Sequence, residues 1–232
     1  MHLVRFSVVA RAALTGFTIA FLIERIRRDL KRSFAALKLK RLMVDRLHVP
    51  SGLCASEMDT DDERLRLPAS LGPDGRLQLG DLGHVEFLLE SGGGDLFARH
   101  QKERPICAVL VCMGGAASAV SKELKKKGLT YLGLDGCEDK EGYPLLERHL
   151  LEACTFLRQQ LAAVAPTNGC VLIHCHEGKN RSATLAIAYL MVEHRMRLAD
   201  AVEHVWRRRP IVLSNESFID QLVDLAETEG LL

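Results

Sequence analysis

Residues 171–182 read VLIHCHEGKNRS. The apolar run 171–173 predicts a short buried strand, and the apolar face of residues 182–190 predicts the opening of a helix. The loop between them must curl, and Gly178 supplies the backbone freedom for that curl. Backbone N–H groups of such a loop, together with the free N–H groups at the helix start, converge on one point. That point favours an anion the size of phosphate.

A cysteine and an arginine stand at the two ends of this loop. The converging N–H groups favour the thiolate of Cys175, which is the nucleophilic form. Arg181 adds a planar fork of donors that matches two phosphate oxygens. A zinc site made of His174, Cys175 and His176 does not fit, because adjacent residues on an extended strand point to opposite faces. The pattern therefore indicates a thiolate at the bottom of a phosphate-binding cup, with no metal and no cofactor.

The motif HCxxGxxRS over residues 174–182 resembles the signature loop of the cysteine-dependent protein tyrosine phosphatases, in particular of their dual-specificity branch. WRRRP (206–210) and NESFIDQL (215–222) resemble the family's C-terminal motif, and LQLG (77–80) resembles its opening strand. The similarity covers residues 70–229 and leaves out the N-terminal region. It implies a protein phosphatase that hydrolyses phosphotyrosine and phosphoserine or phosphothreonine through a cysteinyl-phosphate intermediate.

The resemblance also implies a role for each loop residue. Cys175 is the expected nucleophile, Arg181 orients the phosphoryl group, and Ser182 bonds the sulfur and helps it to leave. His174 is expected to fix the loop rather than to act as a base. The phosphate is expected to lie against the backbone of the six residues that follow the cysteine, namely His176, Glu177, Gly178, Lys179, Asn180 and Arg181.

The loop departs from the family's commonest form at two positions. Glu177 replaces a usual small residue, and Asn180 replaces a usual serine or glycine. Lys179 balances the charge of Glu177, so we expect a roughly neutral rim. A carboxylate there would repel a highly charged phosphoinositide headgroup, which favours phosphoproteins as substrates.

A proton donor for the leaving oxygen is also required. In the family an aspartate supplies it from a loop after the strand that here is expected at 130–134. Asp135, Glu138 and Asp139 follow that strand. We expect Asp139 to be the general acid, with Asp135 as the second choice. Two alternatives remain open: a catalytically weak phosphate-binding pseudophosphatase that lacks the acid, and a membrane-associated phospholipid phosphatase.

Composition and charge divide the chain into three parts. The 232 residues are 47% hydrophobic, which is enough for a real core. Residues 1–49 hold eleven Lys or Arg and three Asp or Glu, a net charge of +8, so the net +1 of the whole chain leaves −7 for the rest. No basic patch interleaved with aromatic residues occurs in the body, so no nucleic-acid partner is expected. We expect a helical extension at 1–49, a linker at 50–75 and a catalytic domain at 76–229.

The N-terminal extension allows three interpretations. The apolar run 12–23 and the basic residues after it fit a mitochondrial presequence or a weak membrane anchor. They also fit an amphipathic helix packed on the domain or on a membrane surface, with one apolar face made of Ile26, Leu30, Phe34, Leu37 and Met43. Seven cysteines without regular spacing favour a reducing compartment. We therefore expect a cytoplasmic protein that is membrane-associated or mitochondrial through this segment.

The alternation of strands and helices predicts the fold class. Strands are expected at 76–80, 106–113, 130–134 and 171–175, and helices at 84–90, 116–127, 145–163, 181–195, 198–208 and 215–228. Residues 91–95, SGGGD, are expected to be a flexible loop. The order predicts an α/β domain with a central, mostly parallel sheet of about four to five strands and helices on both faces. A ligand would bind at the carboxyl ends of the strands, where Cys175 lies.

Overall fold

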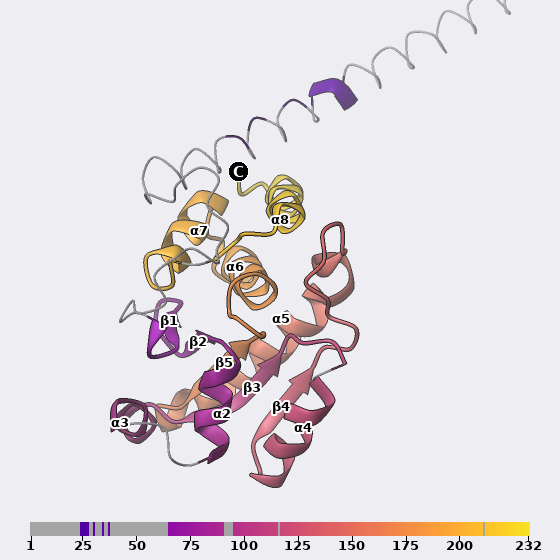
Figure 1. The fold of residues 1–232 in the computed structure, drawn as a ribbon. Coiled ribbons are helices and arrows are strands. Elements are labelled where there is room, and N and C mark those ends of the chain that lie inside the picture. Colours follow the sequence, from indigo (N-terminus) through magenta and orange to yellow (C-terminus); the bar gives the residue numbers. More distant parts are fainter. Residues whose placement is uncertain are drawn as a thin grey trace, which may run out of the picture.

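A computed structural model of the chain describes residues 24–27, 30, 34, 37, 65–90, 95–115, 117–210 and 212–232. Its sheet has the strand order β1-β2-β5-β3-β4 (Figure 1). All neighbouring strands are parallel except β1, which pairs antiparallel with β2. The strands are β1 (Ala69–Leu71), β2 (Leu77–Gly80), β3 (Ile106–Val111), β4 (Thr130–Gly133) and β5 (Cys170–His174). The expected α/β class with a mostly parallel sheet is confirmed.

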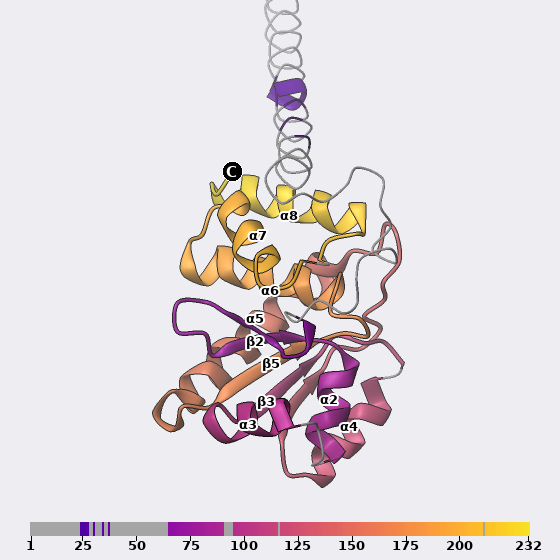
Figure 2. The same cartoon turned by 60° about the vertical axis from the view of Figure 1, so that its left-hand side comes forward.

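Helices cover both faces of the sheet. The helices are α2 (Leu82–Glu90), α3 (Asp95–Glu103), α4 (Ala117–Lys126), α5 (Leu145–Val164), α6 (Arg181–His194), α7 (Leu198–Trp206) and α8 (Glu216–Glu229), and a short 3-10 turn follows α5 at Ala165–Thr167. Helix α5 contacts β3 and β5, α6 contacts β2 and β5, and α7 and α8 pack on α6 (Figure 2). Helix α4 packs against β3 and β4, and α2 lies beside it.

The central strand β5 delivers the signature loop. All five of its residues are buried, which suits an apolar strand covered on both faces. Its last residue, His174, lies in register with Gly80 of β2 and with Val111 of β3. The residues that follow these three strands, Asp81, Cys175 and Cys112, therefore meet at one edge of the sheet.

Two elements differ from those that the sequence predicted. Strand β1 lies inside the stretch expected as a linker, where Ala69 pairs with Leu79 and Leu71 with Leu77. Three residues give too short an alternation to be recognised, and the strand is held by its hairpin partner β2. Helix α3 was not predicted, because DLFARHQKE is mostly polar and its two large apolar residues are adjacent. Residues 91–94 lie outside the described part.

Part of the N-terminal extension is described. Residues 24–27, 30, 34 and 37 are helical. Ile26, Leu30, Phe34 and Leu37 are exposed by 49–71%, so these four side chains do not belong to the core. The apolar run 12–23, Met43 and residues 50–64 lie outside the described residues. In the part of the chain that is described, no helix is both long enough and apolar enough to span a bilayer.

Candidate active site

The loop of residues 175–180 turns its peptide carbonyls outward. Each of these carbonyl oxygens has a partner outside the loop's interior: His174 Nδ1 for residue 175, Leu82 N for 176, Arg209 for 177 and 178, Leu213 N for 179 and Thr184 N for 180. A planar peptide points its N–H away from its C=O, so the N–H groups of residues 176–181 turn inward. The result is a cup lined with N–H groups, which favours an anion.

Arg209 binds the middle of this loop from outside the cup. Its buried guanidinium donates from Nε to Gly178 O (3.0 Å) and from Nη2 to Glu177 O (3.1 Å) and Asp81 Oδ2 (2.7 Å). Burial alone would raise the pKa of Asp81, but the hydrogen bond to His84 and the charges of His84 and Arg209 hold that pKa well below its usual value. The ionised Asp81 is therefore the counter-charge that allows the arginine to be buried.

Gly178 is needed at its position for two reasons. Its φ of +66° lies in the left-handed region, which glycine adopts without strain. A Cβ atom there would also lie 2.6 Å from both Arg209 Nη2 and Gly80 O. The curl predicted from the sequence thus depends on a close approach to Arg209 and β2 as well as on backbone freedom.

Cys175 lies at the bottom of the cup, with 1% of its surface exposed. The hydroxyl of Ser182, in the first turn of α6, donates to its sulfur at 3.2 Å. Burial lowers the pKa of His174 to about 4, so its ring is neutral near pH 7. The contact of its Nδ1 with Cys175 O assigns the proton to that nitrogen. His174 therefore supports the loop, as expected, and is not placed to act as a base.

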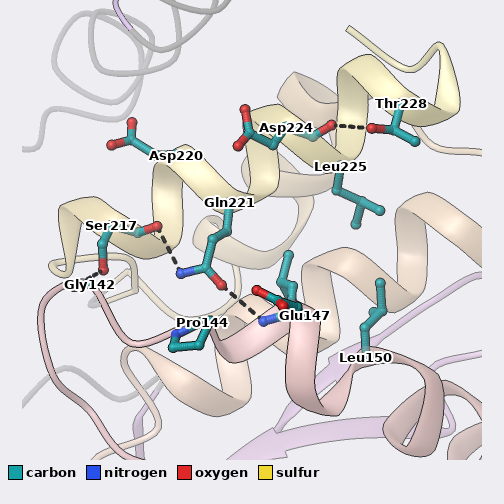
Figure 3. A pocket seen from close by; sticks show the side chains of 11 residues that line it. Gly142, Pro144, Glu147, Leu150, Ser217, Asp220, Gln221, Asp224, Leu225 and Thr228 are labelled. Atoms are coloured by element: carbon teal, nitrogen blue, oxygen red, sulfur yellow. Dashed lines mark hydrogen bonds between the residues drawn. The ribbon is translucent and has the colours of Figure 1, made fainter.

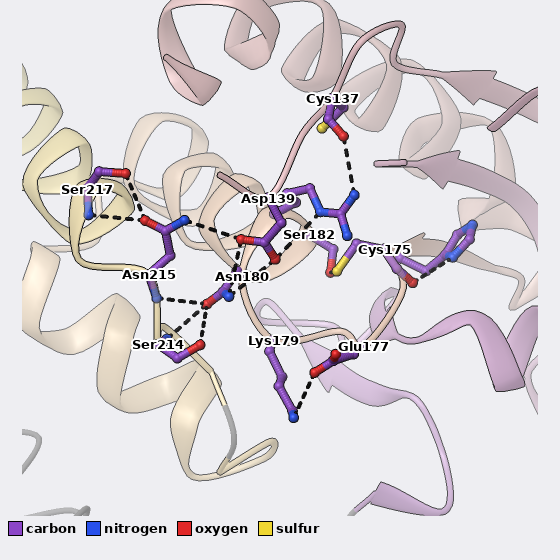
Figure 4. Close-up of polar contacts among 12 residues, drawn as sticks. Cys137, Asp139, Cys175, Glu177, Lys179, Asn180, Ser182, Ser214, Asn215 and Ser217 are labelled. Carbon is purple, nitrogen blue, oxygen red and sulfur yellow. Dashed lines mark hydrogen bonds and ion pairs between the residues drawn. The ribbon is translucent and has the colours of Figure 1, made fainter. Parts of the chain in front are cut away.

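Arg181 connects the cup with the loop that carries the acids. Its Nη1 donates to Cys137 O at 3.2 Å, and its Nε lies 3.7 Å from Asp139 Oδ2 (Figure 4). The Arg181 side chain is only 13% exposed, so the guanidinium is largely buried between the signature loop and the acid loop. Burial raises the pKa of the neighbouring Cys137 thiol to about 12, which leaves that thiol neutral.

Of the three candidate acids, Asp139 is the one that contacts the signature loop. Asn180 Nδ2 donates to its two oxygens at 3.3 and 3.2 Å, and Asn215 Nδ2 donates to Oδ1 at 3.2 Å. Asp135 instead lies where its charge acts on His149, and Glu138 where its charge acts on Tyr143. The structure thus joins Asp139 to Asn180 and Arg181 of the signature loop, whereas the charges of Asp135 and Glu138 act on residues outside that loop.

A family model for the catalytic domain of dual specificity phosphatases matches residues 97–228. The chain belongs to this family. Dual specificity protein phosphatase 1 of Arabidopsis thaliana is 50% identical to the phosphatase domain over 60 residues, which are 26% of this chain and 30% of the relative. Dual specificity protein phosphatase 2 of Mus musculus is 34% identical over 100 residues, which are 42% of this chain and 31% of the relative. The matched part thus spans less than a third of the length of either relative.

Two solved structures share the fold of the phosphatase domain. A mutant form of Tk-PTP superposes with a TM-score of 0.54 at 24% identity and covers 71% of this chain and 98% of that one. The PTP-2 phosphatase of Cydia pomonella gives a TM-score of 0.51 at 24% identity, with coverage of 68% and 89%. The resemblance inferred from the sequence motifs is therefore confirmed for the family and the fold.

The rim of the phosphatase cup carries an ion pair. Lys179 Nζ lies 2.7 Å from Glu177 Oε2, and this contact lowers the pKa of Glu177. The two charges therefore balance, as the sequence analysis expected. Within the described residues, no group of His, Cys, Asp or Glu is arranged to hold a metal ion.

A second hollow, of about 510 Å³, lies between α5 and α8 of the phosphatase domain (Figure 3). It begins at Gly142 and Ser217, and no residue of the signature loop lines it. The charged side chains along it are Glu147, Asp220 and Asp224, all acidic. This groove is therefore unsuited to a phosphate group.

Three residues of the site had no assigned role in the sequence analysis. Arg209 and Asn215 lie in motifs that were noted only as resemblances, and Asp81 was not singled out. Asp81 follows a strand, Arg209 follows the end of α7 and Asn215 precedes α8, and many surface residues share such positions. A sequence signal existed for Asn215, which caps α8 by accepting from Ser217 N at 3.1 Å, but not for its contact with Asp139.

Proposed function

We propose that the chain is a protein phosphatase that hydrolyses phosphotyrosine and phosphoserine or phosphothreonine through a cysteinyl-phosphate. The observation that carries the proposal is Cys175 Sγ at the bottom of a cup whose carbonyls are all bonded outward. Ser182 at the sulfur, Arg181 at the end of the loop and Asp139 beside Arg181 complete the groups that such a reaction requires. Membership in the dual specificity phosphatase catalytic domain family supports the same reaction.

In the proposed first step the Cys175 thiolate attacks phosphorus. The S–P bond forms while the ester P–O bond breaks, and the leaving oxygen takes the proton of the Asp139 carboxyl group. The inward N–H groups and the Arg181 guanidinium stabilise the charge on the three equatorial oxygens. The product of this step is the dephosphorylated side chain and a cysteinyl-phosphate.

In the second step water attacks the cysteinyl-phosphate. The Asp139 carboxylate takes a proton from the water, the S–P bond breaks and inorganic phosphate is released. The hydroxyl of Ser182, 3.2 Å from the sulfur, stabilises the departing thiolate. The chain thereby returns to its starting state with Cys175 ionised and Asp139 protonated.

The paired rim favours phosphoproteins over phosphoinositides. The Glu177 carboxylate is 58% exposed beside the opening, and the nearest rim cation, Lys179, is already engaged with it. A headgroup with several phosphates would therefore meet a local carboxylate and little net positive charge. The acidic body of the domain adds to this repulsion.

The test is turnover by the purified full chain. We expect hydrolysis of a small aryl phosphate and of phosphotyrosine and phosphothreonine peptides, and little release of phosphate from phosphoinositide vesicles. Cys175→Ser should abolish turnover while retaining phosphate binding, because the cup stays intact and a serine hydroxyl is a poor nucleophile. Binding without turnover by the unaltered chain would favour the pseudophosphatase, and a preference for the vesicles would favour the lipid phosphatase.

Asp139→Asn tests the general acid. We expect turnover to fall about 100-fold or more with a poor leaving group, and much less with an activated one that leaves without a proton. If Asp135→Asn shows this dependence and Asp139→Asn does not, the assignment of the acid is wrong.

A further inference from the structure

The side chain of Asn180 joins three separate segments. Its Oδ1 accepts from Ser214 N (2.9 Å), Ser214 Oγ (3.1 Å) and Asn215 N (3.1 Å) in the loop before α8 (Figure 4). Its Nδ2 donates to both carboxylate oxygens of Asp139 in the acid loop. Its backbone belongs to the signature loop and carries the N-cap of α6. One amide therefore bridges the cup, the acid loop and the start of α8.

These contacts fix which end of the amide faces Asp139. The Ser214 and Asn215 backbone groups are donors and can meet only the carbonyl oxygen of the Asn180 side chain. A flipped amide would place its NH₂ against those donors and its oxygen against a carboxylate. The NH₂ group must therefore point at Asp139.

A second amide supports the same carboxylate. Asn215 is buried, and its Nδ2 donates to Asp139 Oδ1 at 3.2 Å while its own Oδ1 accepts from Ser217 N and Oγ. Because Asn180 also binds the backbone N–H of Asn215, the two amides hold each other in place. Asp139 is thus positioned by two neutral donors, and its other close partner is the charged Arg181 at 3.7 Å.

We infer that Asn180 is a positioning residue that holds the general acid over the phosphate cup. The inference rests on the proposed function. A neutral N–H donor can hold the carboxyl group through either oxygen, and so it serves both when Asp139 carries the proton and after the proton has left. A serine or glycine at this position lacks a side chain long enough to contact both Ser214 and Asp139, and it lacks an amide that accepts at one end and donates at the other.

Asn180→Asp is the sharpest variant, because it keeps one half of the bridge. A carboxylate oxygen can still accept from Ser214 and Asn215. The other oxygen repels Asp139 when it is ionised and accepts its proton when it is protonated, so the proton is no longer directed at the leaving oxygen. We expect kcat to fall about 10- to 100-fold with a poor leaving group, the size of effect that misplacement of a reacting group produces. With an activated leaving group the loss should be about tenfold smaller, because no proton is needed.

A double variant with Asp139→Asn distinguishes a positioning role of Asn180 from a general loss of structure in the site. In an Asp139→Asn background there is no acid left to position, so Asn180→Asp should cost less than about threefold further. The inhibition constant for inorganic phosphate should change less than about threefold, because the cup is formed by backbone N–H groups. Asn168→Asp is the matched control: its Nδ2 donates to Glu103 O on a remote turn, and its kinetics should match the unaltered chain with every leaving group.

The outcomes distinguish the inference from the proposed function. If the unaltered chain turns over and Asp139→Asn shows the leaving-group dependence, the acid is in place. In that case two results would overturn the inference alone. One is a fall in the kcat of Asn180→Asp that is equal for all leaving groups, and the other is a fall of the same size when Asn180→Asp is added to Asp139→Asn. If the unaltered chain has no turnover, or Asp139→Asn shows no dependence, the proposed function or its acid fails and the inference fails with it.

Discussion

Replacing Arg209 with methionine should destabilise the loop that forms the phosphate cup, although Arg209 itself does not touch the substrate. The guanidinium is fully buried and donates to the carbonyls of Glu177 and Gly178 and to the Asp81 carboxylate. Methionine has a comparable length and fills much of the space, so a cavity is not the main effect. The variant leaves two loop carbonyls and one carboxylate without their principal donor.

The magnitude follows from these three lost partners. Removing one member of a buried ion pair costs about 3–5 kcal/mol, and an unpaired buried carbonyl costs about 1–3 kcal/mol. Asp81 is 26% exposed and keeps His84, so water and His84 recover part of the loss. We therefore expect the free energy of unfolding to fall by about 3–5 kcal/mol, which lowers Tm by about 10 °C for a domain of this size.

The pH range of the assay follows from Asp81. Its folded pKa is held well below the ordinary value of 3.8. The stability that its ionised form contributes is therefore present above the ordinary value and is lost only as the pH falls toward the folded one. The difference between Arg209→Met and the unaltered chain should thus persist from neutral pH down to about pH 5.

The assay is urea unfolding at neutral pH together with inhibition by inorganic phosphate. Arg208→Met is the matched control, because the neighbouring Arg208 is exposed and donates to His204 O. That control should stay within about 0.5 kcal/mol of the unaltered chain. A loss below about 1 kcal/mol in Arg209→Met, with unchanged phosphate inhibition, would refute the idea that the outward carbonyl bonds hold the cup.

Three further predictions concern other parts of the chain. Burial lowers the pKa of His174 to about 4, so stability should decrease by up to about 3 kcal/mol as the pH falls from 6.5 toward 4, where the unfolded state takes up a proton and the folded state does not. In His174→Asn that part of the slope should vanish in urea unfolding, and an unchanged slope would contradict it. A chain that starts at Val49 should stay folded, keep its turnover of aryl phosphate and move from a membrane or organelle fraction to the soluble one. Loss of folding would contradict the exposure of Ile26, Leu30, Phe34 and Leu37 and show that the domain needs the extension. Peroxide should oxidise the Cys175 thiolate to a sulfenic acid that condenses with the Cys112 thiol and releases water, and peroxide-treated protein without a Cys175–Cys112 cross-link in mass spectrometry would remove this idea.

Most of the fold could be predicted because its strands and helices have clear apolar patterns. The helix expected at 145–163 is observed at 145–164, and the strand expected at 171–175 is observed at 170–174. The pattern failed where it was too short or too sparse, at β1 and α3. A three-residue strand is defined by its hydrogen-bonded neighbour, so β1 becomes recognisable only when β2 is seen beside it.

The site could be predicted as far as its residues are contiguous in the sequence. Cys175, Arg181 and Ser182 lie within eight positions of one another, and their chemistry follows from the loop that joins them. The contact of Arg209 with Asp81 spans 128 positions, and that of Asn215 with Asp139 spans 76. No local pattern encodes such pairs, because they depend on how the strands are ordered in the sheet.

The two halves of the site are held by interactions of different strength. The cup is anchored by a buried guanidinium–carboxylate pair and by backbone hydrogen bonds, so its shape cannot change without the loss of several kcal/mol. Asp139 is 30% exposed and is held mainly by two neutral amides at 3.2–3.3 Å, each worth about 1 kcal/mol. Displacing the Asp139 side chain therefore costs less free energy than deforming the phosphate site. Such a division suits a reaction in which the phosphoryl group must be fixed but the leaving side chain must come and go.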